Sequence, residues 1–533
     1  MKKIIKGIIK KDLGVLILIT ILTVAIGISQ IAFNILFGKI ADAIISGGDL
    51  NKIIKYLIMV SIITIIFIAI RDRIKTYKNN QMMHDVNYEV LTLLQKSDIL
   101  YFSNKSTNNI IQTINIDSWE ITNFICGKAT NAINNTIVVA FISAYIFKLS
   151  PRLFLILFIG IASLSLMYFL LRQYLTKIHA EFRDRQSDYF RSMFSMLENI
   201  FSIKVNSLYD ELGTLFNRAN DNFLRVLDKN EKATIGINNI SFFVIRIVIL
   251  FICVQSVNLI GNGNISVGEF VSIAMLLNIL MPSLNSLLGF NKEYRDVRVN
   301  YERMDKFCKV EKDINGTEYL NDIDNIKIQN LDFAYAKDEK LFDNLNYEFE
   351  KGNIYQIKGT NGTGKTTLTT IMLGLIQPGS GSILYENKDI NTLDTLNIRR
   401  NIIAYVEQEP IIERMTIREN IELGLDGFSE KEYERLYELF DIASFDNGKI
   451  VSQSMLSGGQ KQKINIMKSL LKKSDILFMD EPTSALDHQT REILKKELKT
   501  LAKDKIIIII SHDENFIDIC NKVLDLNKMK EMK

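Results

Sequence analysis

One short segment of the 533-residue sequence combines the residue types and the spacing that bind phosphate groups. Residues 359–367 read Gly-Thr-Asn-Gly-Thr-Gly-Lys-Thr-Thr, after a predicted strand at 353–358 and before a predicted helix at 368–373. In this order, backbone N–H groups of the loop surround the phosphates, and the following helix presents its positive end to them. We therefore expect Lys365 to contact the β- and γ-phosphates and the Thr366 hydroxyl to bind Mg²⁺.

An acidic pair follows a second predicted strand. Residues 476–479 form a short apolar run typical of a strand buried on both faces, and the run ends in Asp480 and Glu481. We expect Asp480 to hold Mg²⁺ through water, and Glu481 to orient and deprotonate an attacking water. A surface acidic pair is the alternative, but adjacent carboxylates repel each other and this pair directly follows a buried strand.

A third predicted strand ends in a histidine. The five consecutive isoleucines at 506–510 are typical of a central parallel strand, and Ser511 and His512 follow them. A lone histidine usually has no chemical role, but one at the same edge of the sheet as Glu481 is placed to sense a γ-phosphate. Together, the three segments predict an α/β domain that hydrolyses a nucleotide.

The elements that position these residues occupy only the second half of the sequence. The mean hydropathy of the whole chain is +0.09, which is high for a soluble enzyme. Six apolar runs are long enough to cross roughly 30 Å of hydrocarbon, at about 13–40, 54–70, 130–147, 152–171, 240–260 and 268–290. Beyond residue 291 no apolar run approaches 18 residues, so we expect a membrane half followed by a soluble half.

The composition excludes several other classes of protein. With 5 Pro and 27 Gly, the chain is neither collagen-like nor disordered. The 4 Cys residues are far apart and form no Cys-x-x-Cys pair, which excludes a disulfide framework, a zinc knuckle and a redox motif. A net charge of +3 gives no indication of nucleic-acid binding, and we expect no nucleic-acid partner.

Basic residues indicate the orientation of the membrane half. They are concentrated in the first eleven residues and in the long segments 71–129 and 172–239, so the positive-inside rule places these parts and the soluble half in the cytoplasm. Because both long segments are rich in helix formers and lack Pro, we expect the membrane helices to continue into the cytoplasm and turn back there. We interpret the basic N-terminus as an interfacial amphipathic helix rather than a cleavable signal; a disordered positive tail is the alternative.

One further motif resembles a known family. Residues 456–460 read Leu-Ser-Gly-Gly-Gln and resemble the signature of the ATP-binding cassette (ABC) ATPases. The resemblance extends to the run Asp-Glu-Pro-Thr-Ser-Ala-Leu-Asp at 480–487, to Gln408 and to Tyr335, all in the family's order. In the membrane half, further stretches resemble the intracellular loops of the family's six-span exporter-type domain and the approach to its sixth span: residues 101–102, 115–120, 198–205 and 263–270.

The resemblance implies roles for individual residues. Tyr335 would stack on adenine, Gln408 would contact Mg²⁺ and the attacking water, and Asp480 would support Mg²⁺. Glu481 would be the base and His512 the switch. The phosphates would lie in the cradle formed by Gly359, Thr360, Asn361, Gly362, Thr363, Gly364, Lys365, Thr366 and Thr367. The ATP of an opposite subunit would meet the signature residues Ser457, Gly458, Gly459 and Gln460, and Asp487 would communicate across that dimer.

The resemblance also implies an architecture. We expect an all-α six-helix transmembrane domain at 1–300, a linker at 301–322, and at 323–533 an α/β P-loop NTPase domain of the ABC type with a helical subdomain. The chain would be a half-transporter that pairs with a second copy of itself, which the complete set of catalytic residues favours, or with a related half. With ATP and Mg²⁺ as cofactors, closure of two cassettes would act on short helices near 112–122 and 206–213 and switch the membrane cavity from inward-facing to outward-facing.

Some positions depart from the family's pattern. Residues 449–455 lack the Glu that exporters usually carry before the signature, so the usual contact of that stretch with the membrane loops is not implied. Lys461 and Lys463 stand where Arg is common, which keeps the charge but loses bidentate geometry. No peptidase-like segment precedes the first span, and we therefore expect no cleavage of a leader peptide.

The cargo is open on sequence grounds. The resemblance favours an exporter of a peptide or bacteriocin, a lipid or an amphipathic drug, in a plasma membrane that the abundance of Ile, Lys and Asn suggests is bacterial. An importer of a small chelate and a non-pumping regulator or channel are the alternatives, whereas six spans exclude a soluble ATPase that acts on DNA.

Polar residues inside the spans offer candidates for contact with cargo. They either line a cavity or form interhelical hydrogen bonds: Gln30, Asn34, Asn131, Asn134, Asn135, Ser241, Asn278 and Asn285. Arg246 is the one charge well inside a span, either as a counter-ion for an anionic cargo or as a side chain that snorkels to the cytoplasmic surface.

Overall fold

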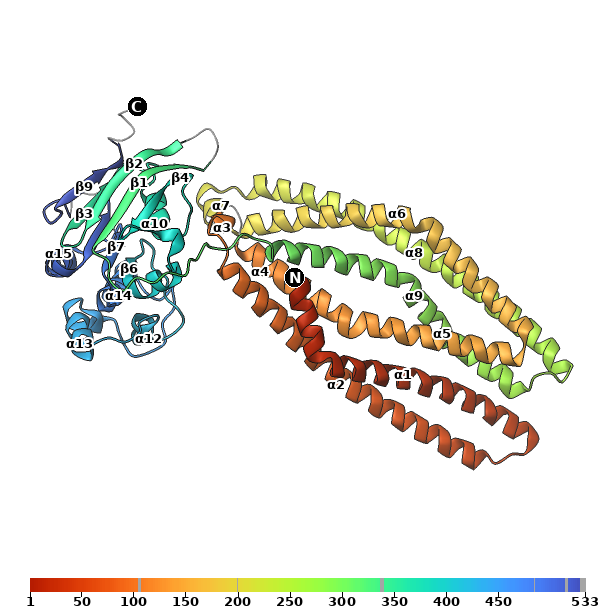
Figure 1. Cartoon of the computed structure of the whole chain (residues 1–533). Helices are drawn as coiled ribbons and strands as arrows, with labels where there is room; N and C mark the ends of the chain where they lie inside the picture. The colour runs from red at the N-terminus through yellow and green to blue at the C-terminus, as the bar shows by residue number, and fades with distance from the viewer. Residues whose placement is uncertain (104–106, 199, 336–339, 484, 513–515, 528–533) are drawn as a thin grey trace. The chain divides into compact units, whose positions relative to one another are not determined.

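The computed structural model describes residues 1–103, 107–198, 200–335, 340–483, 485–512 and 516–527. These residues divide into two compact units, each of which is described by itself (Figure 1). The helical unit comprises residues 1–94 and 108–309, and the sheet unit comprises residues 95–107 and 310–533.

The helical unit is built from long helices. Their bounds are α1 (Lys2–Ser46), α2 (Leu50–Gln95), α4 (Thr107–Asn123), η1 (Phe124–Lys128), α5 (Ala129–Leu149), α6 (Pro151–Glu198), α7 (Ile200–Asn206), α8 (Tyr209–Gly261) and α9 (Val267–Phe307). Within the described residues, six helical segments are long and apolar enough to cross a membrane: Lys2–Ser46, Leu50–Gln95, Ile110–Leu149, Pro151–Leu171, Tyr209–Gly261 and Val267–Phe307. The prediction of six spans is confirmed.

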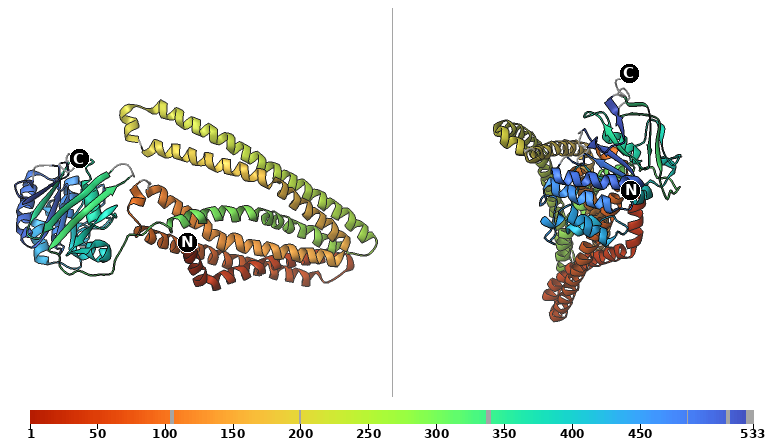
Figure 2. Two further views of the ribbon diagram at one scale, coloured as in Figure 1. Left: turned by 45° about the horizontal axis from the view of Figure 1, so that its top comes forward. Right: turned by 90° about the vertical axis from the view of Figure 1, so that its left-hand side faces the viewer.

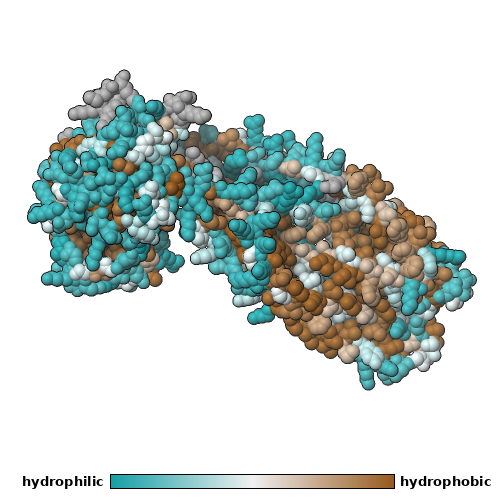
Figure 3. All heavy atoms as spheres, viewed as in Figure 1, coloured by the Kyte–Doolittle hydropathy of each residue, from teal (hydrophilic) through white to brown (hydrophobic). Residues whose placement is uncertain are grey.

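The surface of the helical unit fits a lipid environment. Figure 3 shows apolar side chains as a band over these helices, with polar side chains on either side of the band. In α2, large apolar side chains such as Ile62 and Ile65 are more than half exposed (53% and 66%). A helix that exposes large apolar side chains in this way is stable only where the surrounding medium is itself apolar.

Four helix pairings hold the helical unit together. The helices α6 and α8 run side by side in the left view of Figure 2, α1 lies along α9, and α5 packs against both α1 and α9. Asp42 near the end of α1 fixes the start of α9, because its carboxylate accepts hydrogen bonds from Ser266 Oγ (2.8 Å) and Gly268 N (2.7 Å). The glycines at Gly38 and Gly268 allow the two backbones to approach closely there, since a Cβ on either would collide with its neighbour.

The short helices between spans are not where the sequence predicted them. We expected short helices near 112–122 and 206–213, but residues 110–149 form one continuous helical span and residues 209–213 begin the long α8. The regular helix α4 ends at Asn123, but the chain stays helical through the π-helical turn Phe124–Lys128, which contains Gly127, and on into α5. The short helices are instead α3 (Leu100–Ser103) and α7 (Ile200–Asn206), and Ser207 in a left-handed conformation (φ 56°) separates α7 from α8.

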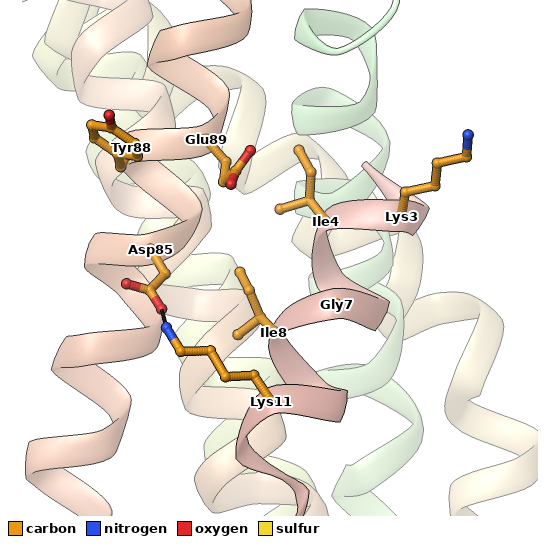
Figure 4. A pocket seen from close by; sticks show the side chains of 8 residues that line it. All are labelled: Lys3, Ile4, Gly7, Ile8, Lys11, Asp85, Tyr88 and Glu89. Atoms are coloured by element: carbon orange, nitrogen blue, oxygen red, sulfur yellow. Dashed lines mark hydrogen bonds and ion pairs between the residues drawn. The ribbon is translucent and has the colours of Figure 1, made fainter.

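The N-terminal segment is helical and packs within its unit. Helix α1 begins at Lys2, bends after its first turns in Figure 1, and is anchored by the amino group of Met1, 3.5 Å from Asp305. Figure 4 shows Ile4, Ile8 and Lys11 turned toward α2 across a cavity of about 470 Å³. Lys11 Nζ donates to Asp85 Oδ2 at 2.7 Å.

The sheet unit contains two sheets, and the predicted α/β fold is confirmed. An antiparallel sheet has the order β2-β1-β4-β5 and a parallel sheet has the order β6-β7-β8-β3-β9. The strand bounds are β1 (Asn325–Ala334), β2 (Lys340–Glu350), β3 (Ile354–Lys358), β4 (Ser380–Tyr385), β5 (Lys388–Asp389), β6 (Ile403–Val406), β7 (Ile476–Asp480), β8 (Ile506–Ile510) and β9 (Lys522–Asp525). The main helices are α10 (Lys365–Met372), α11 (Thr395–Asn397), α12 (Ile417–Glu422), α13 (Glu430–Leu439), α14 (Gly458–Leu471) and α15 (His488–Leu501).

The parallel sheet is buried on both faces, as its isoleucine-rich strands predict. All residues of β7 and β8 are buried. One face packs against the antiparallel sheet and α10, and the other packs against α12, α13, α14 and α15. The register pairs Ile357 with Ile510 and Asp480 with Ile510, so β3, β7 and β8 end at the same level.

The connection between the two halves of the sequence differs from a simple linker. Helix α9 continues to Phe307, inside the range 301–322 predicted as linker. After it, Asp313 N donates to the carbonyl of Lys96, and Ser97 forms a bridge with Lys312. Residues 95–107, which precede α4, therefore group with the sheet unit.

Candidate functional site

The phosphate-binding loop lies where the sequence predicted it. Residues 359–364 connect β3 to α10, and Gly362 and Gly364 have positive φ (81° and 98°), which a residue with a side chain rarely adopts. A Cβ on Gly364 would also lie 2.7 Å from Phe342 Cζ. Lys365 Nζ folds over the loop and donates to the carbonyl of Gly359 at 2.6 Å. The loop thus places backbone N–H groups and one ammonium group at the start of an eight-residue helix.

Side chains beside the loop are held by hydrogen bonds. Thr363 Oγ1 donates to the Thr360 carbonyl at 2.9 Å, and Asn527 Oδ1 accepts from both N and Oγ1 of Thr360 (3.2 and 3.0 Å). The Tyr335 hydroxyl lies 3.0 Å from Thr367 Oγ1, while the tyrosine side chain stays 63% exposed. An exposed aromatic ring next to a phosphate-binding loop can stack on a planar base.

Asp480 lies at the carboxyl end of β7. It is 6% exposed, and Tyr405 Oη donates to its Oδ2 at 3.2 Å. Burial raises the pKa of the Asp480 carboxyl, while the hydrogen bond from Tyr405 and the charge of Lys365 lower it. Because β3 and β7 end at the same level of the sheet, the phosphate-binding loop and the acidic pair belong to one site.

Glu481 is held by the residues that follow β8. His512 Nδ1 lies 2.8 Å from Glu481 Oε1, His512 N donates to the same oxygen at 3.2 Å, and Ser511 Oγ donates to Oε2 at 3.4 Å. Since a carboxylate only accepts hydrogen bonds, Nδ1 carries the proton in this pair. Glu481 also has a left-handed backbone (φ 46°), a strained conformation for a residue with a side chain. The predicted base and the predicted switch histidine are therefore in direct contact.

Gln408 follows β6, the strand next to β7, and its side chain is exposed. A residue from the stretch without the expected Glu supports this loop. Gln453 Oε1 accepts from Ile412 N at 2.7 Å, and its Nε2 donates to the Pro410 carbonyl at 3.0 Å. The stretch 449–455 thus braces the segment that carries Gln408.

The signature residues start a helix of their own. Ser457 caps α14: its Oγ accepts from Gln460 N at 3.3 Å, and its N donates to Gln460 Oε1 at 2.8 Å. Gly459 lies close to the next motif, since a Cβ there would be 2.7 Å from the Ala485 carbonyl oxygen. Across the described ranges, no hydrogen bond or ion pair links Ser457–Gln460 to residues 359–367. Ser457 and Gly458 are exposed and free to meet a group outside this chain.

Asp487 has a structural partner within the chain. It caps α15, where its Oδ1 accepts from Thr490 N at 2.7 Å, and this backbone hydrogen bond lowers the pKa of the Asp487 carboxyl. Ser484, which belongs to the same predicted motif, lies outside the described residues.

The donor set at this edge of the sheet fits Mg²⁺. Thr366, Gln408 and Asp480 can each offer an oxygen ligand, which hard divalent cations prefer. In the part of the chain that the structure describes, no group of three or more His, Cys, Asp or Glu could form a metal cage. Mg²⁺ usually binds through one or two protein oxygens together with substrate phosphates, so the residues present fit the ion.

The polar residues predicted inside the spans separate into different environments. Gln30, Asn34 and Asn278 line one cavity of the helical unit, whereas Ser241 is buried and Asn131 and Asn285 are exposed outside that cavity. Asn134 lies against Gly27 of α1, with its Oδ1 buried. Arg246 is exposed on α8, with its guanidinium 4.7 Å from the ring centroid of Phe242, one turn earlier on the same helix.

Sequence reasoning missed several contributors to the site. The hydroxyl of Tyr405 reaches Asp480, and Gln453 and Asn527 support loops on either side of it. Tyr405 lies on a strand that ends beside Gln408, which is a usable signal. Gln453 and Asn527 carry no such signal, because their partners are backbone groups or residues more than 40 positions away in the sequence.

Comparison with known families covers both units. The family described as "ABC transporter transmembrane region" matches residues 16–284, and the family described as "ABC transporter" matches residues 342–484. The chain is 23% identical over 543 residues to ABC transporter B family member 1 of Dictyostelium discoideum, an alignment that covers 98% of this chain and 59% of the relative. It is 26% identical over 545 residues to a putative export ATP-binding/permease protein of Rickettsia bellii, which covers 97% and 92% of the two chains.

A solved structure has the same fold. It is described as a bacterial Atm1-family ABC exporter with ATP bound, and it superimposes with a TM-score of 0.82 at 19% identity. The match covers 97% of this chain and 94% of the other.

Proposed function

Because this chain belongs to the ABC transporter family, we propose that it uses ATP hydrolysis to move a cargo out of the cytoplasm. It is a multi-pass membrane protein whose ATPase domain binds ATP, and the fold it shares is that of an exporter. The observation that carries the proposal is the contact of His512 with Glu481 at the edge of the sheet that also holds the phosphate-binding loop. A complete hydrolytic arrangement favours steady turnover over a regulator or channel that does not pump.

ATP binding is assigned to residues at the edge of the parallel sheet. Tyr335 stacks on adenine, and residues 359–367 surround the phosphates with N–H groups and the Lys365 ammonium. The ammonium exchanges its hydrogen bond with the Gly359 carbonyl for phosphate oxygens. Thr366, Gln408 and Asp480 would hold Mg²⁺, which when bound neutralises developing charge on the phosphates.

Hydrolysis is assigned to Glu481 and His512. The carboxylate of Glu481 orients a water molecule and takes its proton as the water attacks the γ-phosphorus, while the bond from that phosphorus to the bridging oxygen breaks and ADP leaves. Its three hydrogen bonds, from Ser511 Oγ and from N and Nδ1 of His512, fix the direction of the carboxylate. The side chain of His512 is exposed, so it can give up its hydrogen bond to Glu481 and donate to the γ-phosphate instead. Its position would then differ between bound ATP and bound ADP.

A second copy is proposed to complete each site. Ser457 and Gly458 are exposed at the N-terminus of α14, and across the described ranges no hydrogen bond or ion pair joins them to the phosphate-binding loop of the same chain. A helix N-terminus attracts anions, and here it would face the γ-phosphate held by the partner. Since each catalytic position has its expected residue, a homodimer is favoured over pairing with a related half.

Residues 96–103 are proposed to transmit the motion of the sheet unit. They follow α2, and hydrogen bonds with residues 311 and 313 tie them to the start of the sheet unit. ATP-driven closure of two sheet units would pull on the ends of two spans through this segment. That pull would bias a two-state rocking of the helices from inward-facing to outward-facing.

The orientation and the cargo are also proposals. Basic residues of the N-terminus and of the long interspan segments put these parts and the sheet unit in the cytoplasm of a bacterial plasma membrane. A peptide or bacteriocin, a lipid or an amphipathic drug would be the cargo. The R. bellii relative, a putative export protein, supports export over import.

Inverted membrane vesicles test the proposal. Vesicles from cells that express the chain would be supplied with ATP outside, and their lumenal contents would be compared by mass spectrometry with vesicles that carry Glu481→Gln. ATP-dependent accumulation of a compound in the active vesicles alone is the expected result. Depletion would indicate import, and hydrolysis without any difference in contents would indicate a regulator or channel.

A further inference from the structure

The helical unit contains a cavity of about 460 Å³ between α1, α2 and α9. Three amide side chains line it, Gln30 and Asn34 from α1 and Asn278 from α9, together with the hydroxyls of Ser61 and Thr64 on α2. The remaining lining side chains are apolar, among them Phe33. This volume lies within the range of about 300–1,000 Å³ that is usual for small-ligand sites.

The lining of this cavity carries no charge. Two other cavities of the same unit are different: one is lined by Lys3, Lys11 and Asp85, and another by Asp72, Arg73 and Lys78. Arg246, the charge inside the fifth span, does not line the neutral cavity and lies on another helix, α8. A neutral lining disfavours a phosphate or carboxylate ligand, which needs a cation, and also a cationic ligand, which needs a carboxylate.

The amides in the lining lack hydrogen-bond partners within the protein. Asn34 is 7% exposed and faces the cavity, yet neither it nor Gln30 makes a hydrogen bond within the described ranges. Asn278 reaches only the Ala274 carbonyl on its own helix, at 3.4 Å. Of the three amides only Asn34 is buried, whereas Gln30 and Asn278 are exposed. Buried polar side chains in native proteins are nearly always hydrogen-bonded, so Asn34 is the amide whose position calls for a ligand in the cavity.

The hydroxyls add acceptors to the same cavity. Ser61 Oγ donates to the Leu57 carbonyl at 2.8 Å, and Thr64 Oγ1 donates to the Val60 carbonyl at 2.7 Å. Each hydroxyl has thereby used its one proton, and its lone pairs remain available as acceptors. The cavity therefore offers amide donors, amide acceptors and hydroxyl acceptors together with apolar surface.

We propose that this cavity binds an uncharged peptide segment of the transported cargo, with the amides of Gln30, Asn34 and Asn278 paired to peptide N–H and C=O groups. A primary amide can accept from a peptide N–H and donate to a peptide C=O at the same time. Phe33 and the other apolar lining residues take the apolar side chains of the segment. This inference rests on the proposed function, because it names the class of cargo that the exporter moves.

The test measures binding separately from hydrolysis. The full chain is placed in nanodiscs, and binding of a short N-acetylated, C-amidated peptide of Leu, Gln and Ser with a neutral fluorophore is followed by fluorescence anisotropy. Asn34→Leu removes the amide but keeps a similar shape, and Asn131→Leu, an exposed residue on α5 outside the cavity, is the matched control. Two further peptides replace Gln by Lys or by Glu.

The proposal predicts specific outcomes. Asn34→Leu weakens binding of the neutral peptide about tenfold, as expected for the loss of one or two hydrogen bonds, and Asn131→Leu leaves it unchanged. Asn34→Asp reverses the preference in favour of the Lys peptide. Equal binding to Asn34→Leu and the parent, tighter binding of either charged peptide to the parent, or full displacement by a neutral phospholipid would overturn it. Peptide binding by a parent chain that hydrolyses no ATP would count against the proposed function and not against this site.

Discussion

In the sheet unit, four neighbouring strands end at one edge of a parallel sheet, and each delivers a different functional group. The strands β3, β7, β8 and β6 carry in turn the phosphate-binding loop, the acidic pair, His512 and Gln408. In the helical unit, by contrast, the polar side chains of the neutral cavity come from three long helices and belong to no motif. At the sheet edge, motifs that are recognisable in the sequence meet because their strands end together, whereas only the packing of the helices brings the side chains of the cavity together.

The largest expected effect lies in the sheet unit. Glu481→Gln keeps the shape of the side chain and removes the base, so we expect kcat for ATP hydrolysis to fall by about 100-fold or more with ATP binding retained. Steady-state hydrolysis and nucleotide binding in detergent or nanodiscs measure the two quantities. Glu434→Gln, at an exposed position of α13, is the matched control and should hydrolyse ATP normally. A kcat within threefold of the parent would mean that Glu481 is not the base.

His512→Ala is expected to have a smaller effect on the same reaction. It removes the donor 2.8 Å from Glu481 Oε1 but leaves the carboxylate in place, so we expect a decrease in kcat of about tenfold to a hundredfold. The control is His84→Ala, whose side chain is 78% exposed on α2 in the other unit. Equal losses for both variants would show that the effect is not specific to the sheet edge.

In the helical unit, we expect a buried ion pair to contribute to folding stability and not to ATP hydrolysis. Lys78 Nζ lies 2.7 Å from Asp12 Oδ1, and Asp12 is 4% exposed. Lys78→Met leaves that carboxylate without its partner, so we expect about 3 kcal/mol of lost unfolding free energy, measured by SDS titration. The double variant Asp12→Asn/Lys78→Met should lose less, and Lys52→Met, on an exposed lysine, should lose none. If the loss in the double variant equalled the sum of the losses in the two single variants, Lys78 and Asp12 would not stabilise each other.

The smallest expected effect concerns the loop that carries Gln408. Gln453→Ala removes the two hydrogen bonds to Ile412 N and the Pro410 carbonyl, and each such bond is worth about 1 kcal/mol. We expect a several-fold lower kcat with unchanged ATP affinity, because the loop positions a group for hydrolysis rather than for nucleotide binding. Ser452→Ala is the neighbouring control. A change in ATP affinity without a change in kcat would mean that Gln453 supports nucleotide binding rather than hydrolysis.

Much of the sheet unit could be predicted from sequence, because short motifs coincide with strand ends. The run of isoleucines at 506–510 is a central strand, and residues 476–479 end where Asp480 and Glu481 were expected. Gln453 and Asn527 could not be predicted, since they bond to backbone groups or side chains that only the fold brings near.

The helical unit was predictable in a different way. Apolar length identified the six spans, but the short helices were misplaced because α4 leads through the π-helical turn Phe124–Lys128 directly into α5. Hydropathy also could not separate Asn34, in the cavity, from Asn131, outside it, because both stand in segments apolar enough to cross a membrane. Only the packing of α1 against α9 decides which amide faces inward.

The central claim is that two copies of this chain share each ATP site, and co-expression of two defective variants tests it most directly. One variant is Glu481→Gln, and the other is Ser457→Asp, which keeps an N-cap acceptor for α14 but repels a phosphate brought by the partner. Each variant alone should be inactive, whereas an equal mixture forms mixed dimers with one intact site and should recover about a quarter of the parent's ATP hydrolysis. A mixture as inactive as either variant alone would contradict the shared site.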